Sequence, residues 1–250
     1  MPTYRLDIEY DGTDWHGWQI QPDDQTVQGA IETAMQTALR QAVSITGSGR
    51  TDSGVHASGQ VAHFKTSEPL DAHRLLASLN GLLPDSIAIR DVVCVQDGFH
   101  ARFDAVSRQY RYRIATRPIA LGAPYRWFLR PAPDWKLMNE AACLLKGTKN
   151  FSSFCRTASE TENRVCTISE AIWNASPERD GDLDFVIRAD RFLHGMVRSI
   201  VGSLVDIGNG KAGVESMLDV IAAEDRTAAG FAAPARGLTL EKVEYGESSS

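Results

Sequence analysis

Residues 47–59 read GSGRTDSGVHASG. This stretch contains four glycines and a single carboxylate, Asp52, two residues after Arg50. Because glycine tolerates positive φ and lets another backbone come close, this density predicts an irregular loop shaped around a contact. The ordinary alternative is a surface turn, since Gly, Ser and Asp are also common turn residues.

The stretch lies between two segments with strand character. Val43 and Ile45 precede it, and Ala62 and Phe64 alternate with polar residues after it. Alternation with a period of two residues is typical of a half-buried strand. We therefore expect residues 47–59 to connect two strands.

The remaining elements follow from hydrophobic periodicity and helix caps. Residues 4–10 alternate as a strand, and Thr26 is a candidate N-cap for an amphipathic helix over 27–39. In the segment between this strand and this helix, Trp15 and Trp18 would either contact a ligand or hold a loop in place. Further patterns predict helices over 75–82, 137–145, 193–205 and 214–221 and strands over 87–93, 110–114, 165–173, 183–187 and 238–243.

These elements do not follow a strict βαβ alternation, which predicts an α+β fold with a large mixed sheet. Four prolines between residues 116 and 136 favour this segment as the passage between two halves. We expect an N-terminal half over 1–116 carrying the loop and a basic strand, a C-terminal half over 117–245, and a disordered tail over 246–250.

Composition predicts a globular cytoplasmic protein. Hydrophobic residues make up 43% and charged residues 23% of the chain, which excludes disordered and fibrous classes. The four cysteines are dispersed without a close pair, as in a reducing compartment. The N-terminus lacks the features of a signal peptide, and no apolar run approaches the roughly 18 residues that a membrane span needs.

A basic segment stands out in a chain whose net charge is −6. Seven arginines and one acidic residue lie between residues 102 and 130. Within it, Tyr110 and Tyr112 share one face of a predicted strand, while Arg111 and Arg113 share the other. The arginine face suits an anionic partner, although many strands with such an alternation only expose one polar face to solvent.

Several chemistries fit the loop poorly. A phosphate-binding P-loop needs a Gly-Lys-Ser/Thr ending into a helix, whereas Gly59 precedes a strand. A serine hydrolase is suggested by Ser53 near His56, but neighbours in sequence do not provide the required geometry. A metal site needs several converging ligands, and the loop has one Asp and one His beside Arg50.

A lone carboxylate acting as nucleophile or base fits better. Arg50 and backbone N–H groups would keep Asp52 ionised at neutral pH. An Arg–Asp pair that only makes the turn rigid is the structural alternative, and the loop by itself favours it.

The chain resembles the TruA family of tRNA pseudouridine synthases. The resemblance begins with Gly49–Asp52 followed by Gly54–Ala57 and spans nearly the whole chain. Other blocks similar to that family, in the same order, are Tyr10–Gly12 with Gly17–Gln19, Phe99–Phe103, Arg108–Tyr112, Phe151–Phe154, Phe192–Leu193 with Met196–Arg198 and Val201–Gly202, and Ala233–Pro234 with Gly237–Leu238.

The resemblance implies a fold of two similar α+β halves that share a large, mainly antiparallel sheet flanked by helices. It implies an isomerase that converts uridine to pseudouridine at positions 38, 39 and 40 of the tRNA anticodon stem-loop. Asp52 would be the catalytic nucleophile, Arg50 its partner that helps to extrude the nucleotide, and Tyr110 the ring that packs against uracil. Arg198 would lie near the active site.

Base flipping is consistent with these roles, because a stacked uridine is inaccessible and an aromatic platform offsets part of the unstacking cost. Arg108, Arg111 and Arg113 would then contact RNA phosphates. The isomerisation needs no cofactor and no metal, and the family implies tRNA as partner, a homodimer and no membrane association.

Three residues depart from the family pattern: Ser53, Gly195 and Ala232. Gly195 falls inside a predicted helix, where it would cost about 1 kcal/mol relative to Ala. Two rival functions are an RNA-binding protein without catalysis and an acid–base hydrolase that uses Asp52 with His56.

Overall fold

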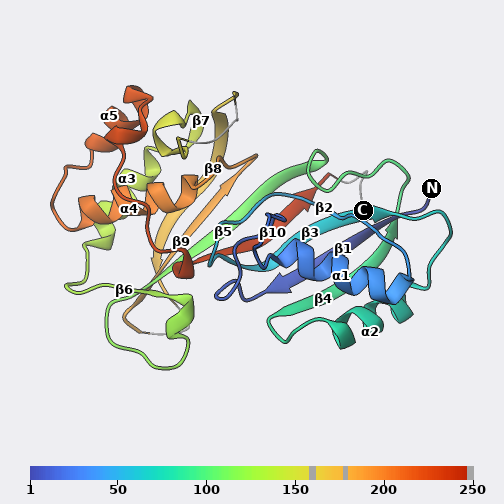
Figure 1. Cartoon of the computed structure of the whole chain (residues 1–250). Coiled ribbons are helices and arrows are strands. Elements are labelled where there is room, and N and C mark those ends of the chain that lie inside the picture. The colour runs from blue at the N-terminus through green and yellow to red at the C-terminus, as the bar shows by residue number, and fades with distance from the viewer. Residues whose placement is uncertain (158–161, 177–179, 247–250) are drawn as a thin grey trace. The chain divides into compact units, whose positions relative to one another are not determined.

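The computed structural model describes residues 1–157, 162–176 and 180–246. Its residues cluster into two compact units, one formed by Met1–Ser107 with Leu240–Ser250 and the other by Arg108–Thr239 (Figure 1). Residues 116–136 lie within the second unit. The predicted boundary at 116 and 117 stays a prediction, and residues 247–250 of the predicted tail lie outside the described residues.

The first unit combines a sheet with two helices. Strand β1 (Thr3–Tyr10) pairs antiparallel with β3 (His56–Lys65) and with β4 (Ile87–Val95). Short β2 (Thr46–Gly47) pairs with β3, and β10 (Leu238–Tyr245) follows β3 in the strand order β4-β1-β3-β10. Helices α1 (Val27–Leu39) and α2 (Ala72–Leu82) contact each other, and α2 contacts β4.

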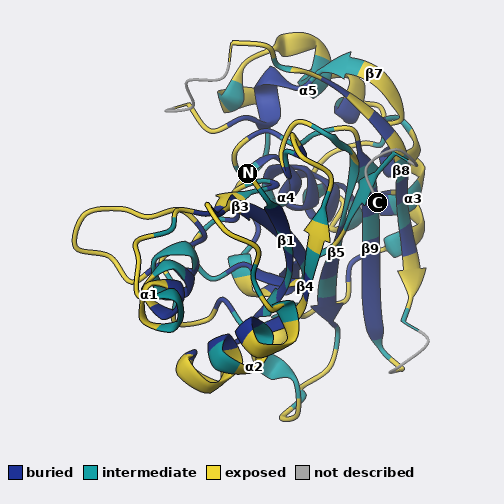
Figure 2. Ribbon diagram, turned by 90° about the vertical axis from the view of Figure 1, so that its right-hand side faces the viewer, coloured by how far each residue is buried: buried dark blue, intermediate teal, exposed yellow. Residues whose placement is uncertain are grey.

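The predicted start of α1 and the predicted face of β1 are confirmed, whereas α2 begins at Ala72, before the predicted range 75–82. Thr26 caps α1 by accepting a hydrogen bond from the Gly29 N–H, and Asp71 caps α2 through the Arg74 N–H. Along β1, side chains at alternate positions are buried. Figure 2 shows α1 and α2 with buried residues on one side and exposed residues on the other, as amphipathic helices require.

The second unit has strand order β5-β9-β8-β7. Strand β5 (Ala105–Ala115), whose first residues belong to the first unit, pairs antiparallel with β9 (Asp182–Ala189) and parallel with β6 (Trp127–Phe128). Strand β8 (Val165–Ala175) pairs with β9 and with β7 (Gly147–Asn150). The helices are α3 (Trp135–Cys143), α4 (Met196–Gly208) and α5 (Ser216–Ala223), with 3₁₀ turns at Ala123–Tyr125, Ser152–Phe154, Arg226–Ala228 and Ala235–Gly237.

The predicted fold class is therefore confirmed: the chain is α+β with a mixed, mainly antiparallel sheet and flanking helices. Strands β5 and β10 each contain residues of both units. No helix of the described residues has the length and hydropathy required to span a bilayer.

Two local predictions were wrong. The loop is shorter than 47–59, because Gly47 closes β2 and His56–Gly59 open β3, which leaves residues 48–55 as the connection. Gly195 does not interrupt a helix: it is the N-cap of α4 with φ of 72°, a left-handed conformation in which glycine is favoured.

Gly59 is required by packing within the first unit. A Cβ at this position would lie 2.1 Å from the carbonyl oxygen of Glu241 in β10. We expect Gly59→Ala to lower the free energy of unfolding by roughly 1–3 kcal/mol, as overpacking does, measured by urea unfolding. Gly81→Ala in α2 is the matched control, because a Cβ at Gly81 meets nothing within 4 Å. Equal stability of the two variants would contradict the packing argument.

Candidate active site

The loop that carries Asp52 is fixed at its first residues by a buried side chain of β3. The Gln60 amide oxygen accepts the Ser48 hydroxyl at 2.7 Å, and its Nε2 donates to the Gly49 carbonyl at 3.1 Å. The Ser48 N–H also donates to the Val61 carbonyl at 2.7 Å. Gln60 is fully buried, so its hydrogen bonds to Ser48 and Gly49 are shielded from water and hold the loop to the strand.

Backbone bonds to residues 12–18 hold the loop on both sides of Asp52. The Thr51 carbonyl accepts the Trp18 N–H at 3.1 Å, and the Trp15 carbonyl accepts the Gly54 N–H at 3.3 Å. The Trp15 carbonyl also accepts the Ser53 hydroxyl at 3.2 Å. Of the two roles predicted for the Trp15–Trp18 segment, these bonds establish that it pins a loop.

Asp52 is half-buried between a buried Thr51 and an exposed Ser53. Its carbonyl oxygen accepts the Val55 N–H at 3.1 Å, which closes a tight turn at Asp52–Val55. In this turn Gly54 has φ of 75°, a conformation that favours glycine. The carboxylate is thus carried by a half-buried residue on a fixed backbone.

Tyr10 supports the loop from β1. Its hydroxyl is 2.8 Å from Thr51 Oγ1, and its ring is buried. Burial raises the pKa of Tyr10 to about 12, against the smaller opposing effects of hydrogen bonds to Thr51 and Gln60. The phenol therefore stays protonated at neutral pH and can serve as a hydrogen-bond donor.

Arg50 is exposed. Its pairing with Asp52 and its role as a substrate contact stay predictions.

His56 is enclosed in structural contacts at the start of β3. Its Nδ1 accepts the Gly12 N–H at 3.0 Å and lies 3.1 Å from the Asp11 carboxylate, and only 3% of the residue is exposed. These contacts hold the end of β1 against β3. His56 therefore has a supporting role, which weakens the rival prediction of an acid–base hydrolase.

Two further predicted site residues lie in the second unit. Tyr110 is buried on β5, and its ring meets Phe192 edge to face with centroids 5.1 Å apart. Arg198, on α4, donates through Nε to the Ala233 carbonyl at 2.7 Å, and the Ala233 N–H donates back to the Arg198 carbonyl. Phe192 was named only as part of a family block, and sequence reasoning did not predict its contact with Tyr110.

The three predicted RNA-contacting arginines also lie in this unit, and each has a partner. Arg111 donates to Asp184 at 2.9 Å, and Arg113 Nε lies 4.0 Å from the same carboxylate. Arg108 donates to the Asp190 carbonyl at 2.8 Å. Sequence reasoning did not single out the buried Asp184, which lies within the predicted strand 183–187 and pairs with these arginines. Phosphate contacts by these arginines stay a prediction.

The predicted site residues are thus distributed as Arg50 and Asp52 in the first unit and Arg108, Tyr110, Arg111, Arg113 and Arg198 in the second. No group of three His, Cys, Asp or Glu suited to a metal occurs within the described ranges.

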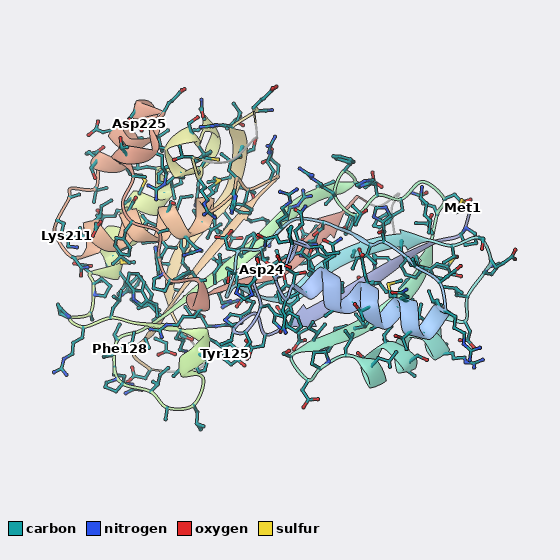
Figure 3. All side chains as sticks on the ribbon, in the orientation of Figure 1. Met1, Asp24, Tyr125, Phe128, Lys211 and Asp225 are labelled. Atoms are coloured by element: carbon teal, nitrogen blue, oxygen red, sulfur yellow. The ribbon has the colours of Figure 1, made fainter. Side chains whose placement is uncertain are left out.

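The second unit also has a small hollow of about 220 Å³. Figure 3 labels Phe128, which lines it, and the neighbouring Tyr125; both are exposed aromatic side chains. Its lining residues are Ala115, Pro118, Ile119, Ala123, Arg126, Phe128 and Arg236.

The model of a protein family described as tRNA pseudouridine synthase matches residues 8–104 and 141–246. The chain belongs to the tRNA pseudouridine synthase family. It is 43% identical over 247 residues to tRNA pseudouridine synthase A of Bacteroides thetaiotaomicron, covering 99% of this chain and 92% of the relative. It is 44% identical over 250 residues to the protein of that name from Brevibacillus brevis, covering 98% of this chain and 100% of the relative.

Family membership confirms the resemblance and gives the reaction class, an isomerase acting on tRNA. The matched segments contain Arg50, Asp52 and Arg198. Arg108, Tyr110, Arg111 and Arg113 lie between them, so the family model does not cover these positions.

The Tyr10–Thr51 bond can be tested through alkaline unfolding. The folded pKa of Tyr10 is about 12, above the value of about 10 in unfolded chains. The contribution of Tyr10 to stability is therefore complete below about pH 10 and is lost as pH rises through about 12. We expect the free energy of unfolding of the wild type to exceed that of Tyr10→Phe by about 0.5–1.5 kcal/mol near neutral pH. In urea unfolding the difference should fall between about pH 10 and 12; a constant difference would contradict this.

Proposed function

We propose that this pseudouridine synthase isomerises uridines 38, 39 and 40 in the anticodon stem-loop of tRNA, with Asp52 as nucleophile. The observation that carries the proposal is the placement of Asp52: a half-buried residue on a loop whose backbone is fixed on both sides. Family membership supports the reaction class.

The reaction breaks the bond between ribose C1′ and uracil N1 and forms a bond between C1′ and C5; C5 loses its proton to water, and N1 takes up a proton from water. Asp52 supplies the electron pair, either to the base or to the sugar, and leaves when the new bond has formed. Both routes need an ionised carboxylate at a defined position, and a fixed nucleophile lowers the entropic part of the barrier.

Base flipping is part of the proposal, because the glycosidic bond of a stacked uridine is not reachable. Extrusion costs about a few kcal/mol. Tyr110 would pack against the extruded uracil, and Phe192 supports this by holding the Tyr110 ring edge to face. Arg50, exposed beside Asp52, would occupy the position that the base vacates, and Arg198 would complete the site.

Arg108, Arg111 and Arg113 would contact the phosphates that flank the target. Asp184 offsets part of the charge of Arg111 and Arg113 and orients them, so that the face carries fixed guanidinium groups and not a diffuse positive charge. The protein would act in the cytoplasm as a homodimer, a state that sedimentation velocity measures directly.

The role of Asp52 is tested with tRNA that carries tritium at uracil C5. We expect Asp52→Asn to release no tritium above background while its affinity for tRNA stays within about threefold, because one carboxylate adds little to a phosphate-dominated interface. Asp85→Asn, an exposed acidic residue of the same unit, is the matched control and should react like wild type. Full activity of Asp52→Asn would show that the nucleophile is misassigned.

The target positions are tested separately. A tRNA transcript with cytidine at 38, 39 and 40 should give no pseudouridine, whereas a transcript that retains uridine only at these positions should be modified. Primer extension after carbodiimide treatment maps the product. Modification of the first transcript at another uridine would overturn the site assignment and leave the reaction class intact.

A further inference from the structure

Phe103 is the large apolar side chain of the first unit that is most exposed: 74% of the residue is accessible. It belongs to the block Phe99–Phe103, which the proposed reaction does not use. The first residue of the same block, Phe99, is buried in a small cluster with Val61 and Ala101. One end of this short segment is thus a core residue, and the other end presents an aromatic ring to solvent.

The exposed ring is the outermost of three neighbouring rings that are tilted relative to one another. The ring centroids of His63 and His100 lie 4.7 Å apart with planes at 52°, and those of His100 and Phe103 lie 4.3 Å apart with planes at 33°. His63 is buried on β3, and exposure increases from His63 to Phe103. The Arg102 guanidinium lies 5.6 Å from the centroid of the Phe103 ring.

Hydrogen bonds fix the backbone of the turn that carries this ring. His100 Nδ1 accepts the N–H groups of Arg102 and Phe103 at 3.2 and 3.3 Å. The His100 N–H donates to the Asp104 carboxylate at 2.7 Å, and the Asp104 N–H donates to the His100 carbonyl. The turn is therefore closed by four bonds among its own residues.

The turn is also tied to two strands. The Ala101 N–H donates to His63 Nδ1 at 3.1 Å, and the Tyr245 hydroxyl, at the end of β10, donates to the Ala101 carbonyl at 2.8 Å. An exposed Phe normally costs little and needs no such support. A ring on a segment whose backbone is already fixed pays a smaller entropic cost of ordering when a planar ligand stacks on it.

We propose that Phe103 and Arg102 form a stacking platform for an unpaired nucleobase of the tRNA, distinct from the target uridine. Aromatic rings and guanidinium planes are the surfaces on which proteins stack single-stranded bases. The positive charge of Arg102 and of the exposed Lys65, whose charge is felt at His63, suits a polyanion. The proposal rests on the proposed function, since it takes tRNA as the ligand.

The test is equilibrium binding of unmodified tRNA to the full chain at fixed salt, by fluorescence anisotropy. We expect Phe103→Ala to weaken binding about 5- to 100-fold, the range that the loss of one stacked base gives. Phe103→Trp should bind like wild type, because it retains a stacking surface. Leu121→Ala is the matched control, since Leu121 is 80% exposed and belongs to the other unit.

Two further readouts separate stacking from other roles. At saturating tRNA, kcat of Phe103→Ala should stay within about twofold of wild type while KM rises. The slope of log affinity against log salt concentration should be the same for Phe103→Ala and wild type, whereas Arg102→Gln should lower this slope by about one, because it removes one positive charge that faces the tRNA. Thermal unfolding verifies that both variants are folded.

Unchanged tRNA affinity of Phe103→Ala would overturn the platform and leave the isomerase proposal standing. A loss of self-association without a loss of tRNA affinity would also overturn it, because the ring would then be a contact between copies. Failure of the wild type itself to bind tRNA would overturn the proposed function together with the platform.

Discussion

The position of Asp52 depends on the close contact of two backbone segments, residues 12–18 and the loop. A Cβ at Gly12 would lie 2.0 Å from the Val55 carbonyl oxygen, and one at Gly17 would lie 2.7 Å from the Thr51 carbonyl oxygen. Only glycine permits this close approach of the two backbones, and the approach lets the Trp18 N–H reach the Thr51 carbonyl. The position of the proposed nucleophile is therefore set by main-chain contacts, which do not change when side chains move.

Polar groups buried beneath the loop reinforce this geometry. Gln60, Tyr10 and His56 are each buried, and each has a hydrogen-bond partner in the loop or in the segment that pins it. A buried polar group without a partner costs about 1–3 kcal/mol, so displacement of the loop would break several bonds at once. This cooperative support is what a preorganised catalytic group requires.

In the second unit, buried carboxylates pair with arginine side chains. Its strand β5 carries the basic face that the sequence predicts, but the carboxylate of Asp184 lies under it and pairs with Arg111 and Arg113. In β9, Asp182 pairs with Arg126 in the same way. These buried anions fix the direction of the guanidinium groups of Arg111, Arg113 and Arg126.

The sequence by itself determined the element types, the cap of α1, the loop around Asp52 between two strands, and the family. These depend on local periodicity and on motifs that are contiguous in the chain. The tertiary structure decided that β3 begins at His56, that α4 begins after Gly195, and that Gln60 clamps the loop. Such features arise from contacts between backbones and buried groups distant in sequence, for which no single segment carries a signal.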